Sequence, residues 1–337
     1  MKKTDRSRKA ILITIGLSLI FAVSNPGLAA ESASVRMGFV PVVTVGPLAL
    51  AIERGYFKEA GIRNELVQMR DSNLRLRALM AEQLDVNWGG FGGDVVNAII
   101  EGAPLRIVAD NGQERKGMTY AYLLVRKDLW ESGVVRDYKD FKGRTISIGG
   151  PKGSINYMFL LRALQKGGLT MKDINFVLVS HPEAPKAFAA KAIDIAYTLE
   201  PFTTRAREMG VAVILAPTVD LAPKGIQTAI LMMNTNFMRQ KRSIAQAWMN
   251  AFLKGVSDYN GALTQGVKKE EFFNIVAKYT KLDLAVVRKV GLPFFDPKGR
   301  LNEESTLEQL DYLYEEGVLK KKIASINEIV DYSLLPK

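Results

Sequence analysis

Leu84-Asp85-Val86-Asn87-Trp88-Gly89-Gly90-Phe91-Gly92-Gly93-Asp94 is the stretch around which this chain is organised. Its apolar start predicts a short strand, the four glycines predict a turn, and Asp94 stands where an N-cap residue would open a helix. Such a turn leaves backbone N–H groups pointing outward at the carboxyl end of a strand, where a small ligand can bind. A single turn of this kind can also serve only to reverse the chain tightly.

The pattern around this stretch occurs twice. Residues 78–88 (ALMAEQLDVNW) align without a gap on residues 187–197 (AFAAKAIDIAY), and residues 37–40 have a counterpart in residues 146–150. Each half predicts a strand, a loop and a helix, then a second helix that leads into a strand ending at a turn. Two similar α/β lobes that face one another would enclose a cleft.

Strands that alternate with helices predict an α/β protein with two lobes, each a mostly parallel sheet flanked by helices. From Ser243 onward the apolar spacing predicts helices whose aromatic residues, such as Trp248, lie in the core. The strands at 120–126 and 226–233 are expected to carry the chain between the lobes, with hinges near 120–126 and 217–226. The expected domains are a signal peptide (1–30), lobe one with the C-terminal helices (31–123 plus 222–337) and lobe two (124–221).

Length and composition fit a soluble globular protein. The chain has 337 residues, about twice a typical domain, with 47% hydrophobic and 24% charged residues. The formal net charge is +11, but no dense run of Lys and Arg with interleaved aromatic residues occurs, which argues against a nucleic-acid partner. The positive surplus indicates either mild steering of anionic solutes or a solvated surface.

The first thirty residues are typical of a secretory signal peptide. A basic start precedes the apolar run Ala10 to Val23, then the breaker Asn25-Pro26-Gly27 and small residues that predict cleavage near Ala30. The alternative is a retained N-terminal anchor, although the apolar run is short for a membrane span. The sequence contains no cysteine, which excludes disulfides and a lipidated cysteine, so we expect a periplasmic protein that is not a lipoprotein.

Catalytic residues are scarce in this sequence. His181 is the only histidine, and the proline that follows it predicts an exposed loop. A serine nucleophile would lack a base unless His181 served, and no His/Cys cluster for a metal occurs. The stretch Gly149 to Ser154 does not satisfy the P-loop pattern, because its lysine precedes the second glycine of the pair. We therefore expect a binding protein rather than an enzyme, without a cofactor or metal.

Polar and aromatic groups remain at the ends of the predicted strands. Ser154 could cap the following helix or turn its hydroxyl to a ligand, and Asp94 is expected to act chiefly as an N-cap. Glu200 could bind a cationic ligand group or favour the positive end of a helix. The candidate ligand-binding residues are Thr44, Asp71, Ser72, Trp88, Gly90, Phe91, Asp94, Tyr120, Lys152, Ser154, Ile155, Asn156, Glu200 and Phe202.

Several motifs together resemble the substrate-binding proteins of ABC importers for nitrate, sulfonates, taurine and thiamine precursors. The resemblance runs from Val35 to about Leu215 and implies a type II periplasmic-binding-protein fold. It further implies a solute held between closing lobes, an ABC permease as the membrane partner, and a monomeric receptor. The motifs are Gly38-Phe39-Val40-Pro41, the segment Glu53 to Ile62, the stretch Leu84 to Asp94, Gly102-Ala103-Pro104-Leu105 and Glu200-Pro201-Phe202.

Other proteins of the same superfamily fit less well. A related enzyme of pyrimidine biosynthesis depends on a cysteine-rich segment and histidine, and this chain has no cysteine. Enzymes of menaquinone synthesis are cytosolic, which disagrees with the predicted signal peptide. The effector half of a transcription regulator would need a helix-turn-helix domain that residues 1–34 cannot supply.

Two ligand classes remain open at this point. Helix N-termini after Gly93 and Ser154, with Lys152 nearby, favour a small aromatic or aliphatic organic anion such as a sulfonate or carboxylate. Asp94 and Glu200 would instead suit a pyrimidine or an amine, which would make the protein a receptor for a thiamine-precursor-like heterocycle. Aromatic residues near the same turns could stack on a planar ring; these are Trp88, Phe91, Tyr157 and Phe202.

Overall fold

The structure is a computed structural model that describes residues 32–69, 71–150, 152, 154–222 and 224–337. The predicted signal peptide and its cleavage site near Ala30 lie outside the described residues. Within the described ranges, no helix combines the length and the apolar character that a bilayer crossing requires.

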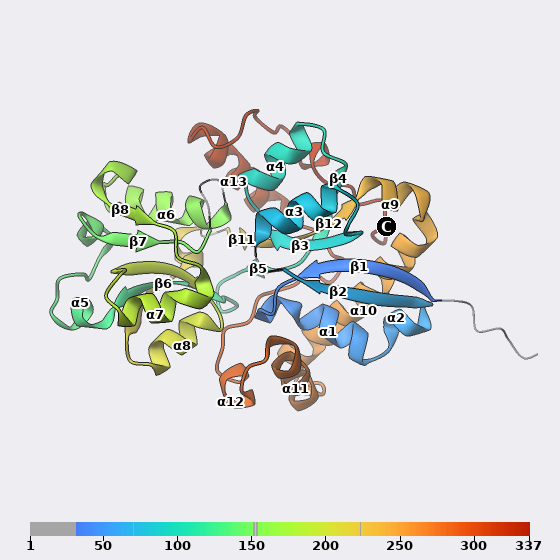
Figure 1. The fold of residues 1–337 in the computed structure, drawn as a ribbon, viewed down its shortest axis with the longest axis horizontal. Coiled ribbons are helices and arrows are strands. Elements are labelled where there is room, and N and C mark those ends of the chain that lie inside the picture. Colours follow the sequence, from blue (N-terminus) through green and yellow to red (C-terminus); the bar gives the residue numbers. More distant parts are fainter. Residues whose placement is uncertain (1–31, 70, 151, 153, 223) are drawn as a thin grey trace, which may run out of the picture. The chain divides into compact units, whose positions relative to one another are not determined.

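The first sheet has five strands in the order β2-β1-β3-β12-β4 (Figure 1). β12 runs antiparallel to both of its neighbours, and the other four strands run in one direction. The strands are β1 (Ala33–Phe39), β2 (Ile62–Gln68), β3 (Val86–Gly90), β4 (Leu105–Asp110) and β12 (Ala229–Asn234).

The second sheet has five strands in the order β10-β6-β9-β7-β8. β6 runs antiparallel to both neighbours, and the other four again share one direction. The predicted α/β class, with two mostly parallel sheets flanked by helices, is therefore confirmed. The strands are β6 (Ala121–Arg126), β7 (Thr145–Ser147), β8 (Asn175–Val177), β9 (Ile195–Leu199) and β10 (Ala212–Pro217).

The two halves of the internal repeat pair their strands in the same register. Met37 of β1 pairs with Val86 of β3, and Ile146 of β7 pairs with Ile195 of β9. Met37 and Ile146 are separated by the same number of residues as Val86 and Ile195. The gapless alignment therefore corresponds to two equivalent strand pairs.

An aspartate ties this strand pair together in each sheet. Asp85 accepts a hydrogen bond from the backbone N–H of Arg36 at 2.8 Å, and Asp194 accepts from the backbone N–H of Thr145 at 2.9 Å. Each carboxylate also forms an ion pair with an arginine, Arg36 for Asp85 and Arg126 for Asp194. The repeat therefore preserves the aspartate and its hydrogen bond to the neighbouring strand, whereas the arginine comes from β1 in one sheet and from β6 in the other.

Helices flank both sheets (Figure 1). In chain order those that belong with the first part of the chain are α1 (Gly46–Glu53), α2 (Tyr56–Glu59), α3 (Ser72–Met80) and α4 (Gly93–Ile100). Those around the second sheet are α5 (Lys127–Glu131), α6 (Ile155–Lys166), α7 (Ala184–Ala189) and α8 (Phe202–Glu208). The C-terminal region contains α9 (Thr235–Gln240), α10 (Arg242–Thr264), α11 (Lys269–Thr280), α12 (Leu284–Val287) and α13 (Glu303–Glu315).

The chain passes between the sheets before β6, not along it as expected. β6 lies wholly in the second sheet, whereas β4 ends the first sheet at Asp110. Between them β5 (Gln113–Glu114) forms a two-stranded antiparallel ribbon with β11 (Ile226–Gln227). β12 then returns the chain to the first sheet, as predicted. The domain boundaries and the hinge positions themselves stay predictions.

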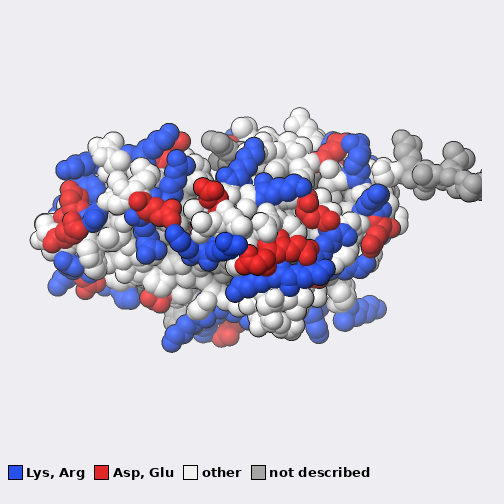
Figure 2. Space-filling model, turned by 90° about the horizontal axis from the view of Figure 1, so that it is seen from below, with Lys and Arg blue, Asp and Glu red and all other residues white. Residues whose placement is uncertain are grey.

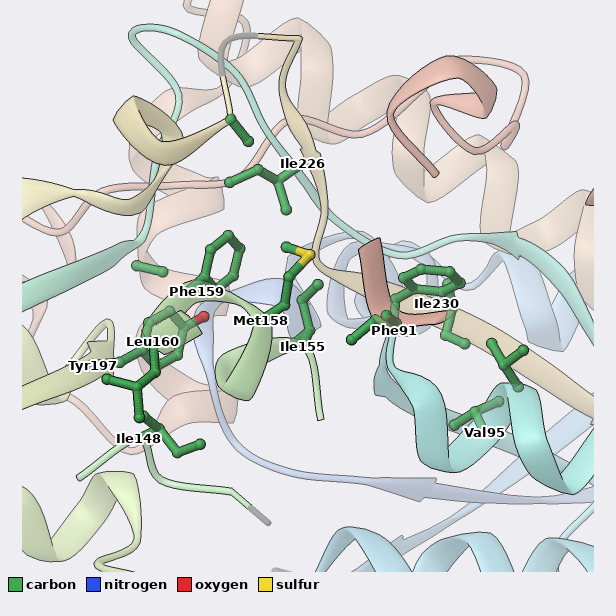
Figure 3. Packing of buried hydrophobic residues seen from close by; sticks show 14 of the residues in the cluster. Phe91, Val95, Ile148, Ile155, Met158, Phe159, Leu160, Tyr197, Ile226 and Ile230 are labelled. Carbon is green, nitrogen blue, oxygen red and sulfur yellow. The ribbon is translucent and has the colours of Figure 1, made fainter. Parts of the chain in front are cut away.

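Two large apolar clusters form the core. In one, the long helix α10 packs against α1, and the rings of Trp248 and Phe252 stack with centroids 5.7 Å apart. The predicted burial of Trp248 is confirmed, because its side chain is fully buried. The other cluster extends from Phe91 near α4 to Ile155 on α6, so it joins side chains that belong with both sheets (Figure 3).

Candidate ligand-binding site

A cavity of about 620 Å³ is lined by residues from both sheets and their connecting loops. Its wall includes the segments that follow β1 and β3 on one side and those that follow β7 and β9 on the other. The carboxyl ends of parallel strands meet at this place, as the repeated strand-turn-helix pattern predicts. The volume lies within the range of sites for small organic molecules.

Eleven of the fourteen candidate residues line this cavity. From the loops and helices of the first part of the chain they are Thr44, Ser72, Trp88, Gly90, Phe91, Asp94 and Tyr120. From the second part they are Ser154, Ile155, Asn156 and Phe202. Contact of any of these residues with a ligand stays a prediction.

Three candidates lie outside the cavity lining. Asp71 is the N-cap of α3 and accepts a hydrogen bond from Leu74 N–H at 2.9 Å. Glu200 is buried and accepts from both the N–H and the hydroxyl of Thr204 at 3.0 Å, so its carboxylate serves the first turn of α8. Burial raises the pKa of Glu200. Lys152 is exposed.

The ends of two helices meet at the glycine-rich turn. A Cβ atom added to Gly92 would stand 2.9 Å from the backbone nitrogen of Ile155 and 3.0 Å from Cα of Ser154. The start of α6 approaches Gly92 so closely that a side chain would not fit there. The backbone of Gly92 is extended, a conformation that any residue can adopt, so packing and not the backbone angle requires the glycine. Gly92 is also the N-cap of α4, so Asp94 lies in the first turn of that helix and its predicted N-cap role is wrong.

The aromatic residues near the turns contribute unequally to the cavity wall. Phe91 is fully buried in the apolar cluster that includes Ile155 (Figure 3). Tyr120 is also buried and donates a hydrogen bond from its hydroxyl to Thr228 at 2.8 Å. Tyr157, which the sequence placed near the same turns, packs against the apolar cluster and is not part of the cavity wall.

Arg75 is a cavity residue that the sequence analysis missed. Its side chain is only 4% exposed, and Nη1 donates to the backbone carbonyl of Met69. Nε has no hydrogen-bond partner. Burial lowers the pKa of Arg75 to about 10, against a raising effect of Asp71, so the guanidinium still carries its charge at neutral pH.

His181 was also missed, because an exposed loop was expected. The residue opens a short 3₁₀ helix (His181–Glu183), is half-buried and lines the cavity. Its Nε2 lies 3.2 Å from Nδ2 of Asn156, which also donates to the carbonyl of Ile148. Burial lowers the pKa of His181 to about 4, so the ring is uncharged at neutral pH.

Charged side chains around the cavity are mostly cationic. Within the described lining, four basic side chains stand against two carboxylates: Arg75, Lys186, Arg205 and Lys281 against Asp94 and Glu183. Burial raises the pKa of Asp94. By contrast, the outer face in Figure 2 shows Lys and Arg interspersed with Asp and Glu. The described residues contain no cluster of His, Cys, Asp or Glu that could hold a metal ion.

Comparison with known proteins identifies a family and a named relative. A profile of the NMT1-like family matches residues 28–260. A protein of Brachyspira hyodysenteriae, provisionally named an ABC transporter periplasmic binding protein, is 23% identical over 266 residues, which cover 75% of this chain and 74% of that protein.

Solved structures with the same fold include binding proteins and an enzyme. The alkanesulfonate-binding protein SsuA from Xanthomonas axonopodis pv. citri, bound to MOPS, has a TM-score of 0.70 at 23% identity, with 90% of this chain and 99% of that chain covered. The desulfurization enzyme DSZB has a TM-score of 0.61 at 14% identity, with 89% and 97% covered. These likenesses confirm the predicted fold class, but a fold alone does not fix a ligand or an activity.

Proposed function

Since the chain belongs to the NMT1-like family, we propose that it is a periplasmic solute-binding receptor of an ABC importer. It captures a small organic anion in the cavity between the two sheets and delivers the anion to a permease in the inner membrane. The proposal is supported by the name of the Brachyspira relative and by the fold that the chain shares with an alkanesulfonate-binding protein.

The charge of the cavity wall is the observation that carries the choice of an anion. Basic side chains outnumber carboxylates in the described lining, and the N-termini of α4 and α6 add partial positive charge where they meet. An anion gains from both sources, whereas a cation would be repelled by most of this wall.

The size and apolar part of the wall favour an organic ligand over an inorganic oxyanion. A water molecule occupies about 30 Å³ in the liquid, so an ion of four or five atoms would leave most of the 620 Å³ filled with water. Apolar side chains that line the same cavity can instead cover a hydrocarbon or aromatic body. These are Leu76, Trp88, Phe91, Val95, Ile155 and Met232.

A thermal-shift screen tests the ligand class. Purified protein is melted with sulfonates, aromatic carboxylates, nitrate and uncharged pyrimidines, each at several concentrations. A free ligand held at 100 times its dissociation constant stabilises the folded protein by about 2.7 kcal/mol, which is an easily measured shift. We expect organic acids to raise the melting temperature more than nitrate does. A shift with pyrimidines alone would contradict the anion proposal.

A receptor for a thiamine-precursor-like heterocycle is the second candidate. Asp94 and the aromatic Trp88 both line the cavity, and together they suit a planar ring that carries N–H groups. The same screen separates the two candidates. An enzyme on the same fold, as DSZB illustrates, would reveal itself because the purified protein would convert the bound compound into a product.

Export belongs to the proposed function and has a separate test. We expect the mature protein in the periplasmic fraction to begin near residue 31, which intact-mass measurement of the fractionated protein would detect. An intact N-terminus in the cytosolic fraction would contradict export.

A further inference from the structure

Arg75 is the one fully buried arginine among the described residues, and it has no carboxylate partner. Three partly buried arginines do have one, since Arg54 pairs with Asp258, Arg126 with Asp194 and Arg162 with Glu308. The charge of Asp71 raises the pKa of Arg75, but the Asp71 carboxylate accepts a hydrogen bond from Leu74 N–H and forms no ion pair with the guanidinium. Arg75 is nevertheless 4% exposed.

Burial of an unpaired charge is unfavourable, so such a group usually has a partner. Within the described residues, the guanidinium of Arg75 makes one hydrogen bond, to the Met69 carbonyl, and Nε lacks a hydrogen-bond partner. A guanidinium presents five N–H donors in a planar fork that fits the two oxygens of an acidic group. The side chain lines the cavity, so a ligand could supply the missing anion.

The surroundings of Arg75 form a polar corner within the cavity. Gln68 at the end of β2, Ser72 at the start of α3 and Asn87 within β3 line the cavity. Asn87 is 1% exposed, and its Oδ1 also lacks a hydrogen-bond partner. Two buried polar side chains with unused hydrogen-bonding atoms therefore adjoin one part of the wall.

Gly38 makes room for this corner. A Cβ atom at Gly38 would stand 2.9 Å from Oδ1 of Asn87 and 3.4 Å from Cδ of Arg75. A side chain at position 38 would therefore press on both polar groups. The approach of Arg75 to Asn87 depends on a position where the chain carries no side chain.

We propose that Arg75 is the anion-pairing residue of the cavity and that it selects organic acids over their uncharged isosteres. This inference rests on the proposed function. The carboxylate or sulfonate pairs with the guanidinium of Arg75, and the apolar body of the acid extends along Trp88 and Leu76. The unpartnered Oδ1 of Asn87 is an acceptor, so it binds no oxygen of the acid group. The exposed Arg205 on the opposite part of the wall contributes mainly long-range attraction.

Titration calorimetry with matched ligand pairs tests this assignment. The probes are benzoate with benzamide, and benzenesulfonate with benzenesulfonamide, so that each acid has an uncharged isostere. The proteins are wild type, Arg75→Gln and the control Arg205→Gln. We expect Arg75→Gln to weaken binding of the acids on the order of 10- to 100-fold, the range of a hydrogen bond to a charged group. Binding of the amides should change little, and Arg205→Gln should weaken the acids by less than about fivefold.

Melting of the ligand-free proteins gives a second readout. Removal of the unpaired buried charge should raise the melting temperature of Arg75→Gln, and loss of the bond to the Met69 carbonyl should lower it, so we expect a small net change that shows a folded variant. Loss of acid binding by a folded variant is then assigned to the missing guanidinium. The variant is thus informative even if its ligand binding is too weak to measure.

The outcomes separate this inference from the proposed function. If wild type binds the acids and Arg75→Gln binds them equally well, the assignment of Arg75 is wrong while the receptor proposal stands. If wild type prefers the amides to the acids, both the anion proposal and the role of Arg75 are wrong.

Discussion

At the scale of single residues, His181 is held uncharged by the groups that enclose it. Its ring lies against Gly149 and beside Tyr197, with ring centroids of His181 and Tyr197 5.7 Å apart. Burial lowers the pKa of His181 to about 4 from an ordinary value of 6.5. Because the sequence has a single histidine, its titration can be followed without interference from others.

We predict that the pH dependence of stability contains a component from His181. The unfolded chain binds a proton near pH 6.5 and the folded protein near pH 4, so acidification between these values favours unfolding. The stability that wild type holds over His181→Gln at pH 7 should decrease by up to about 3 kcal/mol by pH 4. Urea unfolding of both proteins across this range measures the difference, and parallel curves would count against the lowered pKa.

The His181 ring packs directly against the backbone of Gly149. A Cβ atom at Gly149 would overlap the imidazole, and the backbone there has a φ of +69°. We predict that Gly149→Ala destabilises the protein by more than about 2 kcal/mol, from left-handed strain and overpacking together. Gly133→Ala is the control, because φ is +76° but nothing lies within 4 Å of the added atom. Equal losses for the two variants, measured by thermal unfolding, would contradict the packing argument.

At the scale of elements, close contact between helices explains a second glycine. In α10, a Cβ atom at Gly255 would overlap the carbonyl of Pro47 and stand 2.9 Å from Cβ of Ala51 in α1. Gly261 lies in the same helix with only Val267 at 3.9 Å. One helix therefore contains a glycine that packing requires and a glycine that it does not.

This pair predicts opposite effects of the same substitution. Gly255→Ala should destabilise by about 1–3 kcal/mol because α10 must move away from α1. Gly261→Ala should stabilise by up to about 1 kcal/mol, since alanine favours the helix. Chemical denaturation of the two variants decides the point. A neutral Gly255→Ala would mean that α10 and α1 pack less tightly than described.

The repeated elements were predictable from sequence because their information is local. Equal spacing of the aligned strands, with an aspartate at the same place in both halves, predicts the paired registers of β1 with β3 and β7 with β9. The glycine-rich turn likewise predicted the position of the cavity. The hydrogen bond that Glu200 accepts in the first turn of α8 also has a local cause, because its donor Thr204 is only four residues further along the chain.

Other parts of the site depend on contacts that are distant in sequence. Leu74-Arg75-Leu76-Arg77 alternates, so it gives no sign that Arg75 is buried while Leu74 is 51% exposed. The burial of His181 depends on Gly149, which is far away along the chain. The crossing of the chain before β6 follows from the pairing of β5 with β11, two strands of only two residues each. Short pairings of this kind have no recognisable periodicity.

At the scale of the whole molecule, buried carboxylates secure the segments between the sheets. Glu114 of β5 accepts hydrogen bonds from the hydroxyls of Thr119 and Thr218 and from the backbone N–H groups of Tyr120 and Ala121. The contact with Thr218 joins the two segments that run between the sheets.

We predict that ligand binding closes the lobes. Small-angle X-ray scattering should give a smaller radius of gyration when the protein is saturated with an organic acid that the thermal-shift screen identifies. The dihedral changes should be confined to the two segments that run between the sheets, before β6 and after β10, so that each sheet moves as a rigid body. Identical scattering curves with and without the ligand would argue against closure.

The central claim is that the cavity holds a small organic anion, and native mass spectrometry of freshly purified protein tests it most directly. We predict that a fraction of the protein has a single small-molecule adduct that is released on denaturation and is detected as an organic acid in negative-ion mode. An adduct that proves to be an uncharged or cationic compound, such as a pyrimidine or an amine, would contradict the claim.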